Sequence, residues 1–348
     1  MQRQRMKASP QFNAKVAKVW GRGAPDAEHS FYLFPPLRDY FSRCLSGRTH
    51  GGRRDWYEAW VVETYLADIK PVPACLSICC GFGEVERVLS RLNAFQHCVA
   101  LDLAPTAIAS AKAAARADGI DNIEYRIADL NAAKFEPERY DIVWSNGALH
   151  HITNLDQLVE QIHKTLKPGG LLVANEYVGP NHQQLPHRQL EIINAVMHLL
   201  PHHLRDTREE TLVPRLVSGS RWGRRAWRAS RFASRRLARL FGRKTQPFQF
   251  RKLYDNNPRR FIQQDPSEGV RASDIIPIIK RTFSDVEVGY YNGSILQYAL
   301  DHGFYERFDH AKPNDRDLFE LLTNIEQTMI RIGELQPDNA HIIARKKP

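Results

Sequence analysis

The sequence predicts an α/β fold in which a mainly parallel sheet carries helices on both faces, and three observations support this. Short apolar runs alternate with segments of helical spacing from residue 76 to residue 175, an order that produces parallel strands. The first run ends in a turn that holds Gly81 and Gly83, where missing side chains allow tight backbone geometry and close approach of a ligand. A polar residue follows each of the next three runs.

The spacing of apolar residues predicts the individual elements. Short apolar runs predict strands at residues 76–80, 97–101, 123–128, 140–144, 171–175, 286–290 and 341–345. Apolar residues three or four apart predict helices at residues 84–92, 105–117, 155–166, 275–279 and 317–332. Residues 167–170, Lys-Pro-Gly-Gly, predict a turn before the fifth strand. Ser273 is placed to cap the helix predicted at residues 275–279. Residues before 73 are expected to be partly helical, and the stripe containing Trp56 and Trp60 is expected to cover the ligand.

Polar groups at the strand ends predict a ligand site. The carboxyl ends of parallel strands line one crevice, so the glycine turn, Asp102, Asp129 and Asn146 are expected to meet there. Asp102 follows Gly81 by 21 residues, the spacing at which an acid reaches the ribose hydroxyls of an adenosine ligand. We therefore expect a nucleotide-type ligand.

This pattern resembles the class I S-adenosylmethionine-dependent methyltransferases. The resemblance implies their Rossmann-like sheet, closed by an antiparallel pair of strands, and S-adenosylmethionine as the cofactor. It places the glycine turn around the methionine part of the cofactor, Asp102 at the ribose and Asp129 at the adenine amine. The expected cofactor-binding residues are Cys79, Gly81, Phe82, Gly83, Asp102, Leu103, Asp129, Leu130 and Asn146.

The turn departs from the family pattern at two positions. Ser77 stands where the first strand usually carries an acid, and Cys79 where the motif has its first glycine. A Rossmann-like domain whose cofactor site has decayed is therefore an alternative. A dinucleotide dehydrogenase is disfavoured, because Glu86 occupies the third glycine position of its G-x-G-x-x-G motif.

Two histidines after the fourth strand are the candidate catalytic residues. His150 and His151 follow the Ser-Asn-Gly-Ala segment at residues 145–148, beyond the strand end where the methyl group would meet its acceptor. Histidine near its ordinary pKa suits removal of a proton from an acceptor hydroxyl, and Glu176 after the fifth strand is expected to orient one ring. A similar His-His pair with such an acid occurs in sugar and natural-product O-methyltransferases. The alternative is that one ring only packs against the cofactor or caps a helix.

Other site chemistries are not expected. No third ligand stands at a recognisable spacing from the two histidines, so no metal site is predicted. The Asn/Asp-Pro-Pro-Tyr/Phe motif that amino methyltransferases of DNA bases and glutamine place here is also missing. Two later segments, residues 176–180 and 265–268, resemble bacterial methyltransferases associated with surface glycans or secondary metabolites.

The composition indicates the cellular compartment in which the protein is expected. The 348 residues are 43% hydrophobic, without an apolar run near the length of a membrane span. Cys44, Cys75, Cys79, Cys80 and Cys98 show no paired C-x-x-C spacing, so we expect free thiols in a soluble cytoplasmic protein. The basic residues before Asp26 leave a mitochondrial presequence as an alternative.

The net charge of +10 is concentrated in one stretch. Between Glu210 and Asp255 there are thirteen basic residues and no acid, and without them the net charge would be −3. Within residues 221–244, apolar and arginine residues alternate at helical spacing, which predicts a basic amphipathic helix. Such a helix suits the surface of an anionic membrane, which would place the protein peripherally on the inner membrane face. The alternatives are a lid packed on the protein itself and a nucleic-acid-binding arm.

Four segments are expected: a helical cover at residues 1–72, the cofactor-binding core at 73–177, an inserted cap or lid at 178–270, and the C-terminal part of the core at 271–348. The expected function is O-methylation of a small molecule or glycan, possible targets including lipid-linked acceptors. The alternatives are an RNA methyltransferase guided by the basic arm and a non-catalytic binding protein on the same fold. The oligomeric state and the acceptor are not specified by the sequence.

Overall fold

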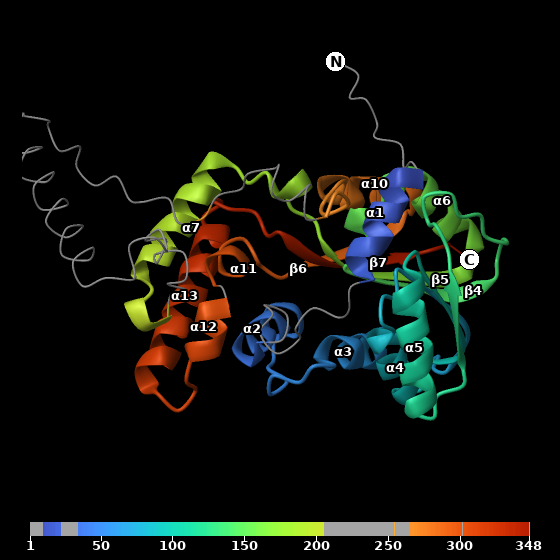
Figure 1. Ribbon diagram of the computed structural model, residues 1–348, viewed down its shortest axis with the longest axis horizontal. Helices are drawn as coiled ribbons and strands as arrows, with labels where there is room; N and C mark the ends of the chain where they lie inside the picture. The colour runs from blue at the N-terminus through green and yellow to red at the C-terminus, as the bar shows by residue number, and fades with distance from the viewer. Residues whose placement is uncertain (1–9, 22–33, 205–253, 255–264, 301, 348) are drawn as a thin grey trace, which may run out of the picture.

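The computed structural model describes residues 10–21, 34–204, 254, 265–300 and 302–347 (Figure 1). The strands are β1 (Val72–Ile78), β2 (Phe95–Asp102), β3 (Ile123–Ile127), β4 (Tyr140–Asn146), β5 (Leu166–Tyr177), β6 (Asp285–Tyr290) and β7 (Asn339–Arg345). The helices before β5 are α1 (Pro10–Trp20), α2 (Pro35–Ser46), α3 (Trp56–Tyr65), α4 (Glu84–Arg91), α5 (Pro105–Ala117) and α6 (Leu155–Thr165). After β5 come α7 (His187–Leu199), α10 (Ile275–Thr282), α11 (Leu296–Ala299), α12 (His302–Arg307) and α13 (Pro313–Arg331).

The sheet confirms the predicted α/β, Rossmann-like class. Its seven strands lie in the order β3-β2-β1-β4-β5-β7-β6. The first five are mutually parallel, and β7 lies antiparallel between β5 and β6. Because β1 and β4 are neighbours although two strands separate them in the chain, their carboxyl ends flank the point where strand order reverses, and ligands bind at such points.

Alternate residues of the strands face two different hydrophobic layers. Cys75 of β1 belongs to the layer that includes α3, α4 and α5, and Leu76 to the layer that includes α6 and α10. Figure 1 shows these helix groups on opposite sides of the sheet. Burial on both faces explains why the central strands read as continuous apolar runs.

Two local expectations are corrected. The predicted turn at residues 167–170 lies inside β5, which begins at Leu166; the pairing with β4 shifts register between Tyr140 and Ile142. Gly169 there has φ +78°, so the segment is an irregularity within the strand. Ser273 does not cap α10: its Oγ donates to Oδ1 of Asn181, 3.0 Å away, and a 3-10 turn precedes the helix.

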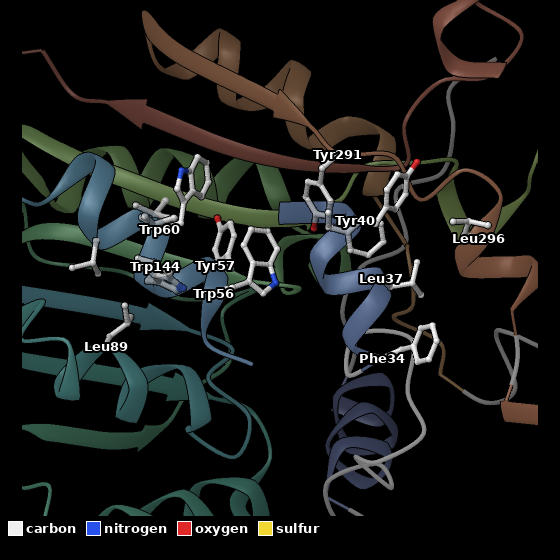
Figure 2. Close-up of a cluster of buried hydrophobic side chains, with 14 of the residues drawn as sticks. Phe34, Leu37, Tyr40, Trp56, Tyr57, Trp60, Leu89, Trp144, Tyr291 and Leu296 are labelled. Carbon is white, nitrogen blue, oxygen red and sulfur yellow. The ribbon is translucent and has the colours of Figure 1, made fainter. Parts of the chain in front are cut away.

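The apolar stripe predicted to cover the ligand is mainly part of the core. Trp56, Tyr57 and Trp60 of α3 are buried, and Figure 2 shows them beside Trp144 of β4. The ring centroids of Tyr57 and Trp144 are 6.2 Å apart. The helix that lies over the cofactor crevice is α1 instead, as described below.

A helical lobe adjoins the antiparallel end of the sheet, at the left of Figure 1. It contains α7, α11, α12 and α13, of which only α13 was predicted. Phe34 contacts the rings of Phe304, Phe308 and Phe319 from this lobe, with centroids 5.2–5.7 Å apart. In the described part of the chain no helix has the length and hydrophobicity needed to span a membrane. The basic segment at residues 221–244 lies outside the described residues.

Candidate active site

A cavity of about 260 Å³ lies at the carboxyl ends of β1, β2 and β4. All the predicted cofactor-binding residues except Gly83 line it: Cys79, Gly81, Phe82, Asp102, Leu103, Asp129, Leu130 and Asn146. Helix α1 supplies another wall through Phe12, Asn13, Val16, Ala17 and Trp20. The sequence therefore located the sheet side of this cavity, and the structure adds the helix that covers it.

Gly83 shapes the turn and does not line the cavity. It has φ +70°, in the left-handed region that favours glycine. A Cβ at this position would lie 2.6 Å from Oη of Tyr125, which is closer than real Cβ contacts. Cys79, at the position of the missing first glycine, also adopts a positive φ of 51°. The turn thus keeps a glycine-like shape at a cost in backbone strain.

The two unusual residues Ser77 and Glu86 lie against each other. Both are buried, and Oγ of Ser77 donates a hydrogen bond to Oε1 of Glu86. Burial raises the pKa of Glu86 to about 7, although the bond from Ser77 opposes the rise. A carboxyl from α4 therefore stands beside the strand position where the family usually carries its acid. The sequence analysis used Ser77 as a departure from the family pattern and Glu86 only as evidence against a dehydrogenase, so their contact was missed.

The predicted ribose acid, Asp102, is held by backbone amides. Its Oδ2 accepts from the N–H of Gly81 at 2.9 Å and its Oδ1 from the N–H of Ala104 at 2.8 Å. Burial raises the pKa of Asp102, and these amide bonds limit the rise. The carboxylate is thereby fixed at the edge of the cavity beside the glycine turn.

The predicted adenine acid, Asp129, is contacted by α1. Its Oδ1 accepts from the N–H of Asn131 at 2.9 Å, and its Oδ2 accepts from Nδ2 of Asn13 at 2.7 Å. The side chain of Asn13 thus binds the acid that the family resemblance assigns to the adenine amine.

These residues fit S-adenosylmethionine. A Cβ built on Gly81 would meet no atom within 4 Å, so the space over the turn is open. Asp102 and Asp129 present carboxylate oxygens from neighbouring strand ends, and carboxylates suit hydroxyl and amine donors. The cavity therefore has a backbone cradle and two correctly typed acceptors for an adenosine compound.

A second cavity of about 730 Å³ adjoins the first. The two share Trp20, Asn146, Gly147 and His151 as lining residues. The second cavity also contains His150 and Glu176, with residues from α2, α3 and the segment at residues 265–268. The three predicted catalytic residues therefore come together at the junction of two cavities, and the second is placed to hold an acceptor.

Glu176 fixes the orientation of His150. Its carboxylate accepts from Oγ of Ser145 at 2.7 Å, from the N–H of Leu149 at 2.9 Å, and contacts Nδ1 of His150 at 3.0 Å. Burial opposes ionisation of Glu176, but its bond with His150 and these donors lower its pKa. Because an ionised carboxylate only accepts, Nδ1 of His150 donates and Nε2 carries the lone pair of the neutral ring.

The two histidines titrate in opposite directions. Burial disfavours a charge on His150, but its hydrogen bond to Glu176 and the nearby acids outweigh burial and raise its pKa. Burial, together with the charge of His150, lowers the pKa of His151. The ring centroids are 4.1 Å apart. His150 is consequently the better proton acceptor, and His151 remains neutral.

His151 is held by residues that sequence reasoning did not place in the site. Its Nδ1 lies 3.1 Å from Oγ of Ser267, which donates to Oδ1 of Asp265 at 2.6 Å. Nε1 of Trp20 donates to Oδ2 of Asp265 at 3.0 Å. The Asp-Pro-Ser-Glu segment at residues 265–268 was noticed as a family resemblance, but nothing in its sequence position indicated that it lies beside the histidines.

Ligating atoms of His150, His151 and Glu268 lie within 4.8 Å of one another, which is the one such group among the described residues. The absence of a metal from this site stays a prediction from the sequence. One nitrogen of His150 is already engaged by Glu176, and Nε2 of His151 is 3.9 Å from Oε2 of Glu268. We interpret the cluster as an acid–base arrangement.

Comparisons with known proteins identify the type of domain. Residues 76–174 match the family described as a methyltransferase domain. A 2-phytyl-1,4-naphtoquinone methyltransferase from a Nostoc species is 24% identical over 175 residues, 49% of this chain and 68% of that protein. A ubiquinone biosynthesis O-methyltransferase from a Methylobacterium species is 28% identical over 167 residues, 47% of this chain and 59% of that protein. This chain thus spans about two thirds or less of these curated relatives.

Phosphoethanolamine N-methyltransferase 2 of Haemonchus contortus, in complex with S-adenosyl-L-methionine, aligns over 84% of this chain and 53% of that chain, with 18% identity and a TM-score of 0.47.

The sheet order and the crevice at its switch point define a class I methyltransferase fold. With the match at residues 76–174, the core of this chain is a class I S-adenosylmethionine-dependent methyltransferase domain, as the sequence predicted.

Proposed function

We propose that the protein transfers a methyl group from S-adenosylmethionine to an oxygen atom of a small molecule or glycan. The observation that carries this proposal is the position of His150, whose ring is oriented by Glu176 inside a second cavity that shares walls with the cofactor cavity. Methyl transfer to a hydroxyl requires alignment of the acceptor and removal of its proton. This arrangement supplies both.

The residues of the chain have distinct roles in this mechanism. When bound, the cofactor supplies an electrophilic methyl group on a positively charged sulfur, and the bond broken leaves its electron pair on that sulfur. Nε2 of His150 takes the proton of the acceptor hydroxyl as the oxygen bonds to the methyl carbon. Glu176 stabilises the resulting imidazolium through Nδ1. Trp20 and Gly147 line both cavities and therefore lie where the cofactor and the acceptor meet.

The chemical type of acceptor is proposed more broadly. Related proteins carry names for methylation of quinones, sterols, phosphoethanolamine and the malonyl group of an acyl carrier protein. Most of these acceptors are lipid-like or bear an anionic group. A cavity of about 730 Å³ with Trp56, Tyr57 and Phe41 in its lining suits a compound with an apolar or aromatic body.

A direct test measures where the methyl group goes. We expect methyl-labelled S-adenosylmethionine to label the oxygen of at least one phenol, quinol or sugar in a panel, and the matched methyl ethers to remain unlabelled. Mass analysis of metabolites from cells with and without the gene would identify the natural acceptor. Label found only on carbon or nitrogen would overturn the assignment to oxygen, and cofactor binding without any turnover would favour a non-catalytic protein.

The proposed location is the cytoplasm, with peripheral contact to an anionic membrane through residues 221–244. The support is the charge pattern of the sequence alone. Each basic residue near an anionic bilayer contributes about 1 kcal/mol, so replacing Arg224, Arg228, Arg231 and Arg235 with Ser should weaken vesicle sedimentation. Salt-dependent binding to RNA in preference to vesicles would instead support the RNA methyltransferase alternative.

A further inference from the structure

Arg38 is a buried cation in the wall of the acceptor cavity. It lies on α2, and its side chain is only 7% exposed although it lines the cavity of about 730 Å³. Its Nε and Nη1 have no hydrogen-bond partner among the described residues. Burying an arginine without an anion or an acceptor is unfavourable, because the group stays charged and loses its hydration.

Neighbouring residues do not neutralise Arg38. The adjacent Asp39 turns its Oδ1 to the N–H groups of His50 and Gly52, at 3.2 Å and 2.8 Å. Burial lowers the pKa of Arg38, the positive charge of Arg54 lowers it further, and Asp39 offsets only part of this. The local field around the guanidinium is therefore positive.

Most acids that line the same cavity are engaged elsewhere, Glu84 having no side-chain partner among the described residues. Asp55 binds Arg53 at 2.8 Å, Glu176 contacts His150, and Asp265 accepts from Trp20 and Ser267. Glu58 is buried, and burial raises its pKa to about 7, so it is partly neutral near that pH. None of these acids lies within 4.0 Å of Arg38. Every ion pair at that distance among the described residues uses a cation other than Arg38.

We propose that Arg38 binds an anionic group, a carboxylate or a phosphate, carried by the methyl acceptor. The planar guanidinium matches both groups, because each offers two oxygens to a pair of N–H donors. The inference rests on the proposed function only in identifying the bound molecule as the acceptor. It narrows the acceptor to a compound with an apolar body and an anionic end, whose reacting hydroxyl lies near His150.

A purely structural role for Arg38 predicts a different effect of its replacement on stability. Under that role, replacing Arg38 would lower the melting temperature of the ligand-free protein, whereas an arginine kept for binding leaves a buried charge that Met removes. We therefore expect Arg38→Met to raise the melting temperature of the ligand-free protein. The arginine would then be retained at the expense of stability, as binding groups commonly are.

The test is anion binding measured by calorimetry at constant ionic strength. The probes are inorganic phosphate and benzoate, which distinguish a phosphate site from a carboxylate site, and sodium chloride is the blank. We expect at least one probe to bind the wild-type protein, and Arg38→Gln to weaken it by tenfold or more, since a charged hydrogen bond is lost. Arg43→Gln is the matched control, because Arg43 is an exposed arginine on the same helix outside this cavity.

The outcomes separate this inference from the proposed function. Binding of neither probe to the wild-type protein, or equal binding by Arg38→Gln, would overturn the assignment of Arg38. Arg38→Lys, which keeps the charge, should retain part of the affinity and shows that loss in Arg38→Gln is not unfolding. If Arg38-dependent anion binding is found but no hydroxyl acceptor is ever methylated, the anion site stands and the O-methylation proposal fails.

Discussion

The two cavities of this protein are built in different ways. The cofactor cavity takes most of its lining from short loops directly after β1, β2, β3 and β4, and its two acids are already satisfied by donors of the chain. The acceptor cavity takes its lining from α2, α3, the histidine turn and residues 265–268, and it contains Arg38, whose Nε and Nη1 have no partner among the described residues. In the ligand-free structure the two acids of the cofactor cavity already accept hydrogen bonds. The arginine of the acceptor cavity has no anionic partner among the described residues.

This difference assigns cofactor binding to one cavity and specificity for the acceptor to the other. Parallel strands deliver their ends to one edge regardless of what the rest of the chain does, so a general cofactor can be held by the sheet alone. Recognition of a particular acceptor depends on segments far apart in the sequence. Changes in the cofactor cavity should therefore alter affinity for S-adenosylmethionine, whereas changes in the acceptor cavity should alter turnover.

The largest effect should come from the acceptor side. We expect His150→Ala to lower kcat by roughly 10²–10⁴-fold, the usual contribution of a general base, with cofactor affinity nearly unchanged. His151→Ala should cost less, because the lowered pKa of His151 makes it a poor proton acceptor. Steady-state kinetics with calorimetry of cofactor binding decides between them. Full activity in both variants would mean that catalysis proceeds by alignment alone.

A second test concerns stability beneath the cofactor turn. Burial raises the pKa of Glu86 from its ordinary 4.5 to about 7, so the folded state binds a proton more tightly than the unfolded state. The stability from this proton is fully present below about pH 4.5 and is lost as pH rises through about 7. Glu86→Gln should therefore raise the free energy of unfolding by about 2–4 kcal/mol at pH 8.

The same Glu86→Gln variant should match the wild type at pH 4.5, where Glu86 is largely protonated. Urea denaturation at the two pH values measures the difference. Glu58 and Asp338, whose pKa values burial also raises to about 7, should keep a residual pH dependence in the variant. A gain in stability that is equal at both pH values would show that Glu86 is not the titrating group.

The cofactor acids should contribute unequally. Asp102→Ala removes a charged hydrogen-bond acceptor and should weaken S-adenosylmethionine by about 1.5–3 kcal/mol. Asp129→Ala should cost less, because Asn13 already occupies Oδ2 of Asp129 at 2.7 Å. Calorimetry on the two variants, with Asp102→Asn as an isosteric control, measures this. Equal losses would contradict the ranking.

The smallest effect is a shift in pH dependence. Glu176 raises the pKa of His150 by accepting its Nδ1–H, and His150 must be neutral to act as a base. In wild-type protein kcat/KM should rise with pH through a value above the ordinary histidine pKa. Glu176→Gln keeps an oxygen acceptor but removes the charge, so this rise should move to lower pH. A profile unchanged by Glu176→Gln would exclude His150 as the titrating base.

The sequence predicted the parts of the structure that depend on local order. Apolar runs and the turns after them located the strands of the sheet and the cofactor residues, since each functional group follows its own strand directly. It also brought His150, His151 and Glu176 together, because β4 and β5 are neighbours. It could not place Arg38, Trp20 or Asp265, whose positions depend on how α1, α2 and the segment at residues 265–268 pack on the sheet.

The bond between Asn13 and Asp129 has a consequence for cofactor exchange. An incoming adenine amine meets an oxygen that already accepts from an amide donor 2.7 Å away, and it can share that oxygen or trade places with the donor. Such a trade leaves the number of bonds unchanged, so the net gain from that contact is small. Helix α1 and the nucleotide site therefore share one carboxylate, so cofactor binding is coupled to the position of α1 through Asp129.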